Sequence, residues 1–158
     1  MLGINVIEGH FGSGKVVIGL LAARFNGFIV QSLIDGAVDT LRRHAGAGQD
    51  YDVVYVPGAL ELPLAAQAMA SSGKYDALIA LGAVIRGSTP HFDIVSAESA
   101  KGLAAVSIAQ NIPVINAILT TNSIEQAIER AGTKAGNKGS EAAMGALEMV
   151  SLLRQLNG

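Results

Sequence analysis

The sequence predicts an α/β fold in which helices cover both faces of a four-stranded parallel sheet, as a doubly wound three-layer sandwich. Short runs rich in Val, Ile, Leu and Ala alternate along the chain with longer stretches of helical periodicity. The apolar runs lack the polar and apolar alternation of a strand that has one face in water, so both of their faces are expected to be buried. The expected strands are Val16–Ala22, Val53–Val56, Ala77–Leu81 and Val114–Leu119.

The stretches between these runs carry helix signals at their ends. Phe28–Ala45 has two arginines in its last turn, as a helix C-terminus favours. Ser123 and Gln126 have the spacing of a capping box, and the helix that they open is expected to stop at Gly132. The other expected helices are Glu61–Ser71, Pro90–Gln110 and Ser140–Leu156.

The chain is expected to consist of an N-terminal arm, residues 1–15, and one domain, residues 16–158. Ile4–Ile7 predicts a short strand that adds to the edge of a neighbouring subunit's sheet, although a frayed terminus accounts for this segment equally well. Gly9–Lys15 matches most of a phosphate-binding loop. Val16 replaces the hydroxyl residue that such a loop needs, and a strand follows in place of a helix, so nucleotide binding is not expected.

Composition narrows the possible partners. Half of the residues are apolar and only 15% are charged, against about 25% in a typical protein, so association with copies of the same chain is expected. No apolar run reaches the roughly 18 residues of a membrane span, and no secretion signal is evident, which predicts a cytoplasmic protein without membrane contact. A net charge of −2 argues against nucleic acid, and the absence of Cys argues against a zinc site.

The loop Gly82–Asp93 carries the densest functional signals. Ligands of a doubly wound sheet bind where the strands end, and this loop follows the third strand. Thr89 suits the N-cap and Pro90 the first helical position, which leaves the amides around Gly87–Thr89 free to bind an anion at the positive end of the helix dipole. His91 stands beside that anion, although an ordinary surface histidine is the alternative.

A second group of candidates is cationic. Arg130, Lys134 and Lys138 lie in a glycine-rich stretch. Three cations in such a stretch are more often a solvated face than a ligand site.

Several segments together resemble the signature segments of the lumazine synthase family, in the family's order and spacing across roughly residues 16–150. They are Arg24–Asn26, Val56–Pro63, Lys74–Ala77, Ala80–Gly87, His91–Asp93, Leu119–Thr121 and Ile124–Gly139. The resemblance implies a flavodoxin-like fold and a transferase of riboflavin biosynthesis. This enzyme condenses 5-amino-6-(D-ribitylamino)uracil with 3,4-dihydroxy-2-butanone 4-phosphate, without a metal or organic cofactor, and releases 6,7-dimethyl-8-ribityllumazine, phosphate and water.

The resemblance also implies an assembly and roles for individual residues. The family forms pentamers, some of which close into icosahedral capsids of about 60 subunits, and its active sites are shared between adjacent subunits. His91 would shuttle protons, while Arg130 and Lys138 would reach the site from the neighbour. Pyrimidine contacts are implied for Phe25, Asn26, Ala59, Leu60, Glu61, Val84, Ile85, Asn116 and Lys138, and phosphate contacts for Gly87, Ser88, Thr89 and Arg130.

One departure from the family concerns Asn116 and Ala117, where the family usually has an aromatic residue followed by glycine. Loss of an aromatic stacking partner predicts weaker pyrimidine binding, and a hydrogen bond from the Asn116 amide to the ring is the alternative. Two other functions stay open: a shell or carrier protein without catalysis, and a flavodoxin-like binder of flavin or nucleotide. The presence of His91, Arg130 and Lys138 favours the enzyme.

Overall fold

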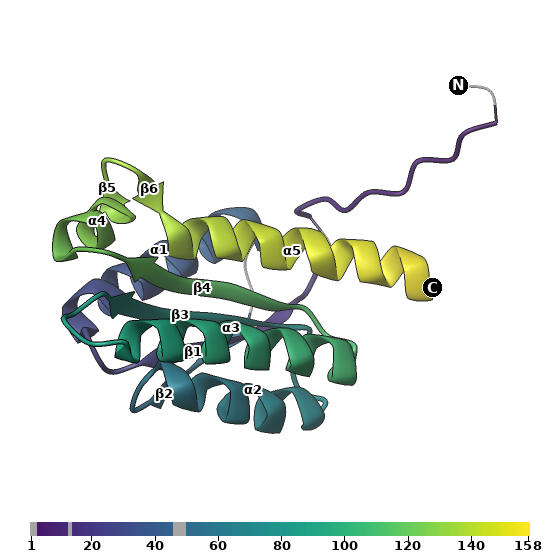
Figure 1. Ribbon diagram of the computed structural model, residues 1–158. Helices are drawn as coiled ribbons and strands as arrows, with labels where there is room; N and C mark the ends of the chain where they lie inside the picture. Colours follow the sequence, from purple (N-terminus) through teal and green to yellow (C-terminus); the bar gives the residue numbers. More distant parts are fainter. Residues whose placement is uncertain (1–2, 13, 46–49) are drawn as a thin grey trace.

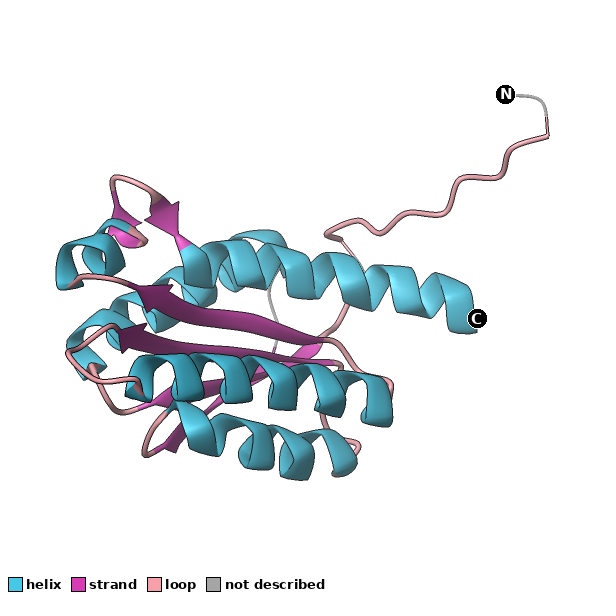
Figure 2. Ribbon diagram, in the orientation of Figure 1, coloured by secondary structure: helices cyan, strands magenta, loops and turns pink. Residues whose placement is uncertain are grey.

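A computed structural model describes residues 3–12, 14–45 and 50–158. Four strands form one parallel sheet in the order β2-β1-β3-β4, as Figures 1 and 2 show. The strands are β1 (Val17–Ala23), β2 (Asp50–Val56), β3 (Ala77–Ile85) and β4 (Val114–Thr121). The predicted four-stranded parallel sheet is confirmed.

Helices cover both faces of this sheet. On one face lie α1 (Gly27–Ala45) and α5 (Lys138–Asn157), and on the other lie the 3₁₀ turn η1 (Ala59–Glu61), α2 (Leu62–Ser71) and α3 (His91–Gln110). Alternate residues of β1 point into the two cores, so that Leu20 packs beneath α1 and α5 and Leu21 beneath α2 and α3. The three-layer, flavodoxin-like architecture is therefore confirmed.

The chain after β4 differs from the prediction. The helix that Ser123 caps, α4 (Ile124–Glu129), ends before Gly132 because Arg130 already leaves helical geometry, with φ −98° and ψ 0°. A short antiparallel hairpin follows, made of β5 (Ala131–Thr133) and β6 (Gly136–Asn137). The last helix then begins at Lys138, two residues earlier than expected.

The loop after β3 is shorter than predicted. The strand continues through Ile85, which is in register with Thr121 of β4. The predicted cap of the next helix at Thr89 is wrong, because α3 starts at His91 with Pro90 as its N-cap and no capping side chain. The carbonyl of Pro90 accepts hydrogen bonds from the amides of Asp93 and Ile94, which opens the helix without help from Thr89.

The N-terminal arm extends from the body beside α5 (Figure 1). Its base is held by the Ser151 hydroxyl, which accepts from the amide of His10 at 3.1 Å, and by the Gln155 side chain, which donates to the carbonyl of Glu8 at 2.8 Å. The described arm residues 3–12 form no strand within the chain. Pairing of Ile4–Ile7 with a neighbour's sheet therefore stays a prediction. Ser13 lies outside the described residues.

Large apolar side chains remain exposed on several elements. Phe28 at the start of α1 is 88% exposed, Leu64 on α2 is 78% exposed and Ile108 on α3 is 86% exposed. Within the described ranges, no helix is both long and apolar enough to cross a bilayer.

Candidate active site

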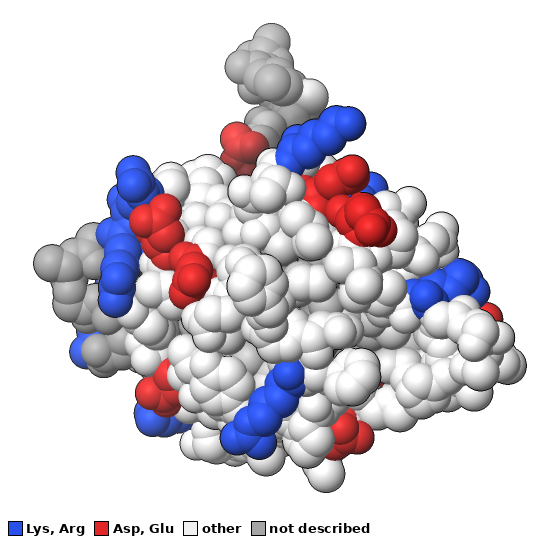
Figure 3. Space-filling model, turned by 90° about the vertical axis from the view of Figure 1, so that its left-hand side faces the viewer, with Lys and Arg blue, Asp and Glu red and all other residues white. Residues whose placement is uncertain are grey.

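A cavity of about 520 Å³ lies where β1, β2 and β3 end. Figure 3 views this end of the molecule, where much of the surface is uncharged and the charged side chains stand in separate groups. The cavity brings together most of the predicted pyrimidine and phosphate residues with His91. Its wall consists of Ala23, Phe25, Asn26, Pro57, Gly58, Ala59, Leu60, Glu61, Ala83, Val84, Ile85, Gly87, Thr89, His91, Phe92, Val95 and Ile124.

Asn26 fixes the turn between β1 and α1. Its backbone is left-handed, with φ +59°, a conformation that Asn tolerates better than most residues. Its side chain donates to the carbonyl of Ala83 on β3 at 2.8 Å, while its own carbonyl accepts from the amides of Ile29 and Val30 at the start of α1. The turn is thus tied to the centre of the sheet, and Phe25 is left 73% exposed on the cavity wall.

The segment after β2 forms the opposite wall. The amides of Arg24 and Phe25 donate to the carbonyls of Val56 and Pro57, which holds the ends of β1 and β2 together. Ala59 is a largely buried part of the wall, whereas the Glu61 side chain is exposed. This side of the cavity therefore offers apolar surface together with one carboxylate.

The loop between β3 and α3 supplies free backbone donors. In the described part of the chain, no hydrogen bond engages the amides of Gly87, Ser88 or Thr89. They precede the N-terminus of the 20-residue helix α3, where the helix dipole favours negative charge. Gly87 and Thr89 line the cavity and Ser88 does not, while His91 lines it from the first residue of α3.

Arg86 joins this loop to two other elements. Its amide donates to the carbonyl of Thr121, and its side chain donates to the Asn122 amide oxygen at 2.9 Å and contacts the Asp93 carboxylate at 3.4 Å. Its guanidinium also lies 4.3 Å from the centroid of the Phe92 ring. Arg86 thereby holds the first turn of α3 against the end of β4.

The remaining predicted residues lie elsewhere. A second cavity, of about 430 Å³, borders β4, the β5–β6 hairpin and the start of α5. It contains Asn116, Arg130 and Lys138, none of which lines the first cavity. Its wall consists of Asn116, Ile118, Leu119, Thr120, Arg130, Ala135, Lys138 and Glu141. Within one chain, the predicted site is therefore divided into two separate halves.

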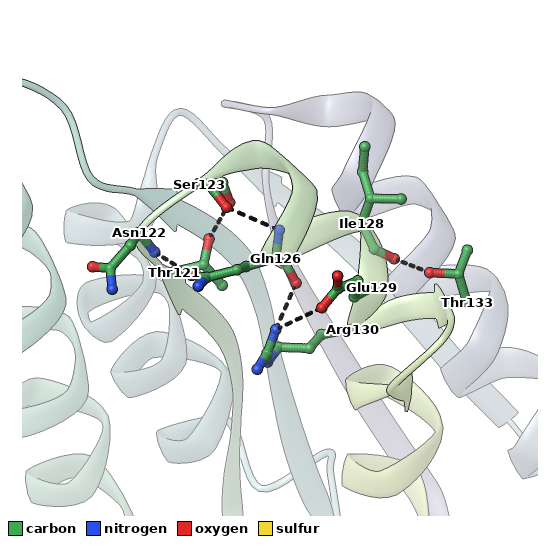
Figure 4. A network of polar contacts seen from close by, with 8 residues as sticks. All are labelled: Thr121, Asn122, Ser123, Gln126, Ile128, Glu129, Arg130 and Thr133. Carbon is green, nitrogen blue, oxygen red and sulfur yellow. Dashed lines mark hydrogen bonds and ion pairs between the residues drawn. The ribbon is translucent and has the colours of Figure 1, made fainter.

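Arg130 is positioned by the end of α4 (Figure 4). Its guanidinium donates to the carbonyl of Gln126 at 2.9 Å and lies 3.7 Å from the Glu129 carboxylate. The predicted cap of this helix is confirmed, because the Ser123 hydroxyl accepts from the amide of Gln126 at 3.2 Å. In a standard capping box the Gln126 side chain would accept from the amide of Ser123. Here it accepts from the amide of Asn122, one residue earlier.

Asn116 lies on the outer edge of the sheet, since β4 is the last strand. Its side-chain oxygen accepts from the amide of Ile118 at 2.8 Å. This oxygen thereby pairs the amide of Ile118. Among the described residues, the side-chain NH₂ of Asn116 has no protein acceptor. An exposed amide thus stands in the cavity that also contains the two cations.

Several wall residues of the first cavity were not predicted. Phe92 lies within one of the segments that resemble the lumazine synthase family, but the resemblance implies no contact for it. Val95 and Ile124 reach the wall from α3 and α4. No sequence pattern identifies Ile124 as a wall residue, because it reaches the cavity only when α4 packs beside β3.

Shifted pKa values occur away from both cavities. A hydrogen bond from Lys74, followed by one from Tyr75, lowers the pKa of Asp52. The same bond to Asp52 raises the pKa of Lys74, and burial raises that of Tyr75. None of these three residues lines either cavity.

Residues 15–154 match the family model of 6,7-dimethyl-8-ribityllumazine synthase. The chain belongs to this family. It is therefore a transferase of riboflavin biosynthesis, from a lumazine synthase family that acts on small molecules and forms oligomers. The matched region includes both cavities and leaves out nearly all of the N-terminal arm.

Proposed function

We propose that the chain condenses 5-amino-6-(D-ribitylamino)uracil with 3,4-dihydroxy-2-butanone 4-phosphate to 6,7-dimethyl-8-ribityllumazine, with release of phosphate and water, in the cytoplasm. The observation that carries this proposal is the first cavity, which combines an apolar wall, free loop amides and His91 in a member of the lumazine synthase family. An aromatic amine and a ketone form an imine when held in register, so the protein must chiefly position both substrates and move protons.

The pyrimidine is placed against the walls at the ends of β1, β2 and β3. The exposed ring of Phe25 offers a stacking face. Asn26, Ala59, Leu60 and Glu61 line the same space as Val84 and Ile85, whose main-chain groups are available at the end of β3. An apolar cavity with a few polar groups suits a flat heterocycle that carries a polyol chain.

The phosphate is placed at the loop that precedes α3. The amides of Gly87, Ser88 and Thr89 would donate to its oxygens, and the dipole of α3 would stabilise its charge. Charge developing on the departing phosphate would be held by donors that are already in place. His91, adjacent to this loop and exposed to the cavity, would carry protons between the amine, the ketone and water.

Each active site is assembled from two subunits. The second cavity contributes Arg130 to the phosphate and Lys138 and Asn116 to the pyrimidine side of a neighbour's first cavity. This arrangement is supported by the separation of the two predicted groups within one chain, because neither cavity alone holds all of the expected site residues. A cyclic assembly repeats the same heterologous contact at every interface, as a pentamer does.

We further propose that pentamers close into an icosahedral shell. The Gly132–Lys138 segment resembles that of family members that form closed particles, which supports a shell. The exposed apolar side chains of Ile4, Val6 and Ile7 support pairing of the arm with a neighbour's sheet. Mass photometry of the purified protein distinguishes a pentamer from a closed particle, and a purely monomeric distribution would contradict the shared site.

The reaction is tested by mixing purified protein with both substrates and following lumazine fluorescence. We expect turnover well above the rate without protein, and we expect a His91→Ala variant of the same oligomeric state to lose most of it. A background rate for the wild-type chain would contradict the enzyme and would favour a shell or carrier protein, for which the unusual Asn116 is the supporting feature.

A further inference from the structure

The two cations of the second cavity are joined through the backbone of one hairpin. Arg130 precedes β5 and Lys138 follows β6, and the amide of Lys138 donates to the carbonyl of Arg130 at 3.0 Å. Two more bonds tie the hairpin to α4, from the amide of Ala135 to the carbonyl of Glu129 and from the Thr133 hydroxyl to the carbonyl of Ile128, each at 2.8 Å. The spacing between the two cations is therefore set locally, while Ala131 of β5, buried in the core with residues of α1, packs the hairpin on the body.

Asn137 connects this hairpin to the body of the protein. Its side-chain oxygen accepts from the amides of Gly139 at 2.8 Å and Ser140 at 3.1 Å, which caps α5. Its side-chain NH₂ donates to the carbonyl of Ser32 on α1 at 3.0 Å, across 105 residues of sequence. Asn137 is half-buried, so its amide bridges two helices at the point where the hairpin meets them.

Two glycines allow the Asn137 side chain and the start of α5 to lie close to α1. A Cβ atom on Gly36 of α1 would lie 2.4 Å from this side chain, and a Cβ atom on Gly139 would lie 2.0 Å from the carbonyl oxygen of Leu33. Gly36 therefore leaves the room that the Asn137 side chain occupies, and Gly139 lets the start of α5 approach the backbone of α1. A shift of the hairpin along α1 would break the bond to Ser32.

We propose that Asn137 is a positioning residue that helps to set where Arg130 and Lys138 stand relative to the sheet edge, and so how well Arg130 holds the phosphate-bearing substrate and Lys138 the pyrimidine. Asn137 lines neither cavity and is not expected to touch substrate. This inference rests on the proposed function, because it assigns the two cations to a shared active site. Asn137 affects where the two cations lie although it is not itself part of a cavity wall.

The variant Asn137→Asp isolates the bridging bond. A carboxylate keeps an oxygen that can cap α5, and its charge suits the N-terminus of a helix. It cannot donate to the carbonyl of Ser32, and it places two acceptors face to face. Ser140→Ala is the matched control, because it removes another bond between the same two helices, from the Ser140 hydroxyl to the carbonyl of Gly36, and leaves the hairpin untouched.

The test combines steady-state kinetics with amide hydrogen exchange on the intact oligomer. For Asn137→Asp we expect the KM for the butanone phosphate to rise roughly tenfold and the KM for the pyrimidine to change less. The amides of Ala135 and Lys138 should exchange faster. For Ser140→Ala we expect both KM values and both exchange rates to stay near those of the wild type.

Unchanged exchange at Ala135 and Lys138 in Asn137→Asp would overturn the positioning role, whether or not the wild type makes lumazine. Faster exchange with an unchanged KM for the phosphate substrate would overturn its link to binding. An inactive wild type with faster exchange in the variant would contradict the proposed function alone. Asn137→Ser, which keeps a capping oxygen and loses the donor, serves in the same way if the aspartate variant does not fold.

Discussion

Replacement of Asn116 by phenylalanine tests how the second cavity meets the pyrimidine. Asn116 lies beside Arg130 and Lys138, and in the proposed assembly it faces the stacking ring of a neighbour's Phe25 across the bound pyrimidine. Asn116→Phe would place a second aromatic face on the substrate.

The expected effect divides between binding and stability. One favourable aromatic contact is worth about 0.5–1.5 kcal/mol, which corresponds to a KM for the pyrimidine lower by about 2- to 12-fold. The variant also loses the bond from the Ile118 amide to Asn116, worth about 0.5–1.5 kcal/mol. Loss of this bond is expected to lower the free energy of unfolding, which chemical denaturation measures separately from the KM.

The assay is steady-state lumazine formation with the pyrimidine varied and the butanone phosphate saturating. Asn116→Leu is the control, because it removes the same amide and adds apolar volume without an aromatic face. We expect Asn116→Phe to lower the KM and Asn116→Leu to leave it unchanged or higher. An unchanged or higher KM for Asn116→Phe, with the oligomer intact, would refute the placement of this residue beside the pyrimidine.

Three other substitutions give separate tests. His91→Gln should lower kcat by roughly 10- to 100-fold, at the low end for general acid–base catalysis because solvent can also carry protons; a kcat within about twofold of the wild type would rule out the proton shuttle. Arg86→Met should lower the free energy of unfolding by about 1 kcal/mol, through loss of an exposed ion pair and the Phe92 contact, and should raise the KM for the butanone phosphate. Arg43→Met, which breaks an exposed pair with Asp39 on α1, is its control, and equal KM values for the two variants would contradict the role of Arg86. Asp52→Asn should weaken the fall in the free energy of unfolding at acid pH. The folded protein holds the pKa of Asp52 below its usual 3.8, so the ionised carboxylate stabilises the fold fully above that value, and this stabilisation is lost as the pH falls through the lowered pKa. Chemical denaturation of both proteins between about pH 6 and pH 2 measures the effect, and an equal fall in the free energy of unfolding for variant and wild type would argue against it.

Apolar runs and helix periodicity were enough to predict the sheet and its covering helices. The runs at β1 and β3 are buried on both faces, and this is the property that distinguishes strands of a covered parallel sheet from those of an open one. The composition of Pro90 and the residues before it predicts a helix start there, and α3 does start at His91. An anion bound at this loop stays a prediction.

Other features depend on tertiary structure and were missed for that reason. The sequence predicts that the third strand ends at Leu81, just before Gly82. In the structure β3 continues to Ile85, because β4 pairs with it as far as Thr121. The β5–β6 hairpin is too short for a periodic pattern, so its residues were included in a helix or a turn. The family resemblance implies that Arg130 and Lys138 come from a neighbouring subunit, but the grouping of Asn116 with them follows from the position of β4 at the sheet edge.

The central claim, that adjoining subunits share each catalytic centre, is tested most directly by mixing His91→Ala and Arg130→Ala chains and letting them assemble together. Each variant alone has one defective half in every centre. In a randomly mixed ring, about one quarter of the interfaces pair an intact histidine with an intact arginine, so about one quarter of the wild-type activity should return. Mixed oligomers that stay as inactive as the separate variants would contradict the claim.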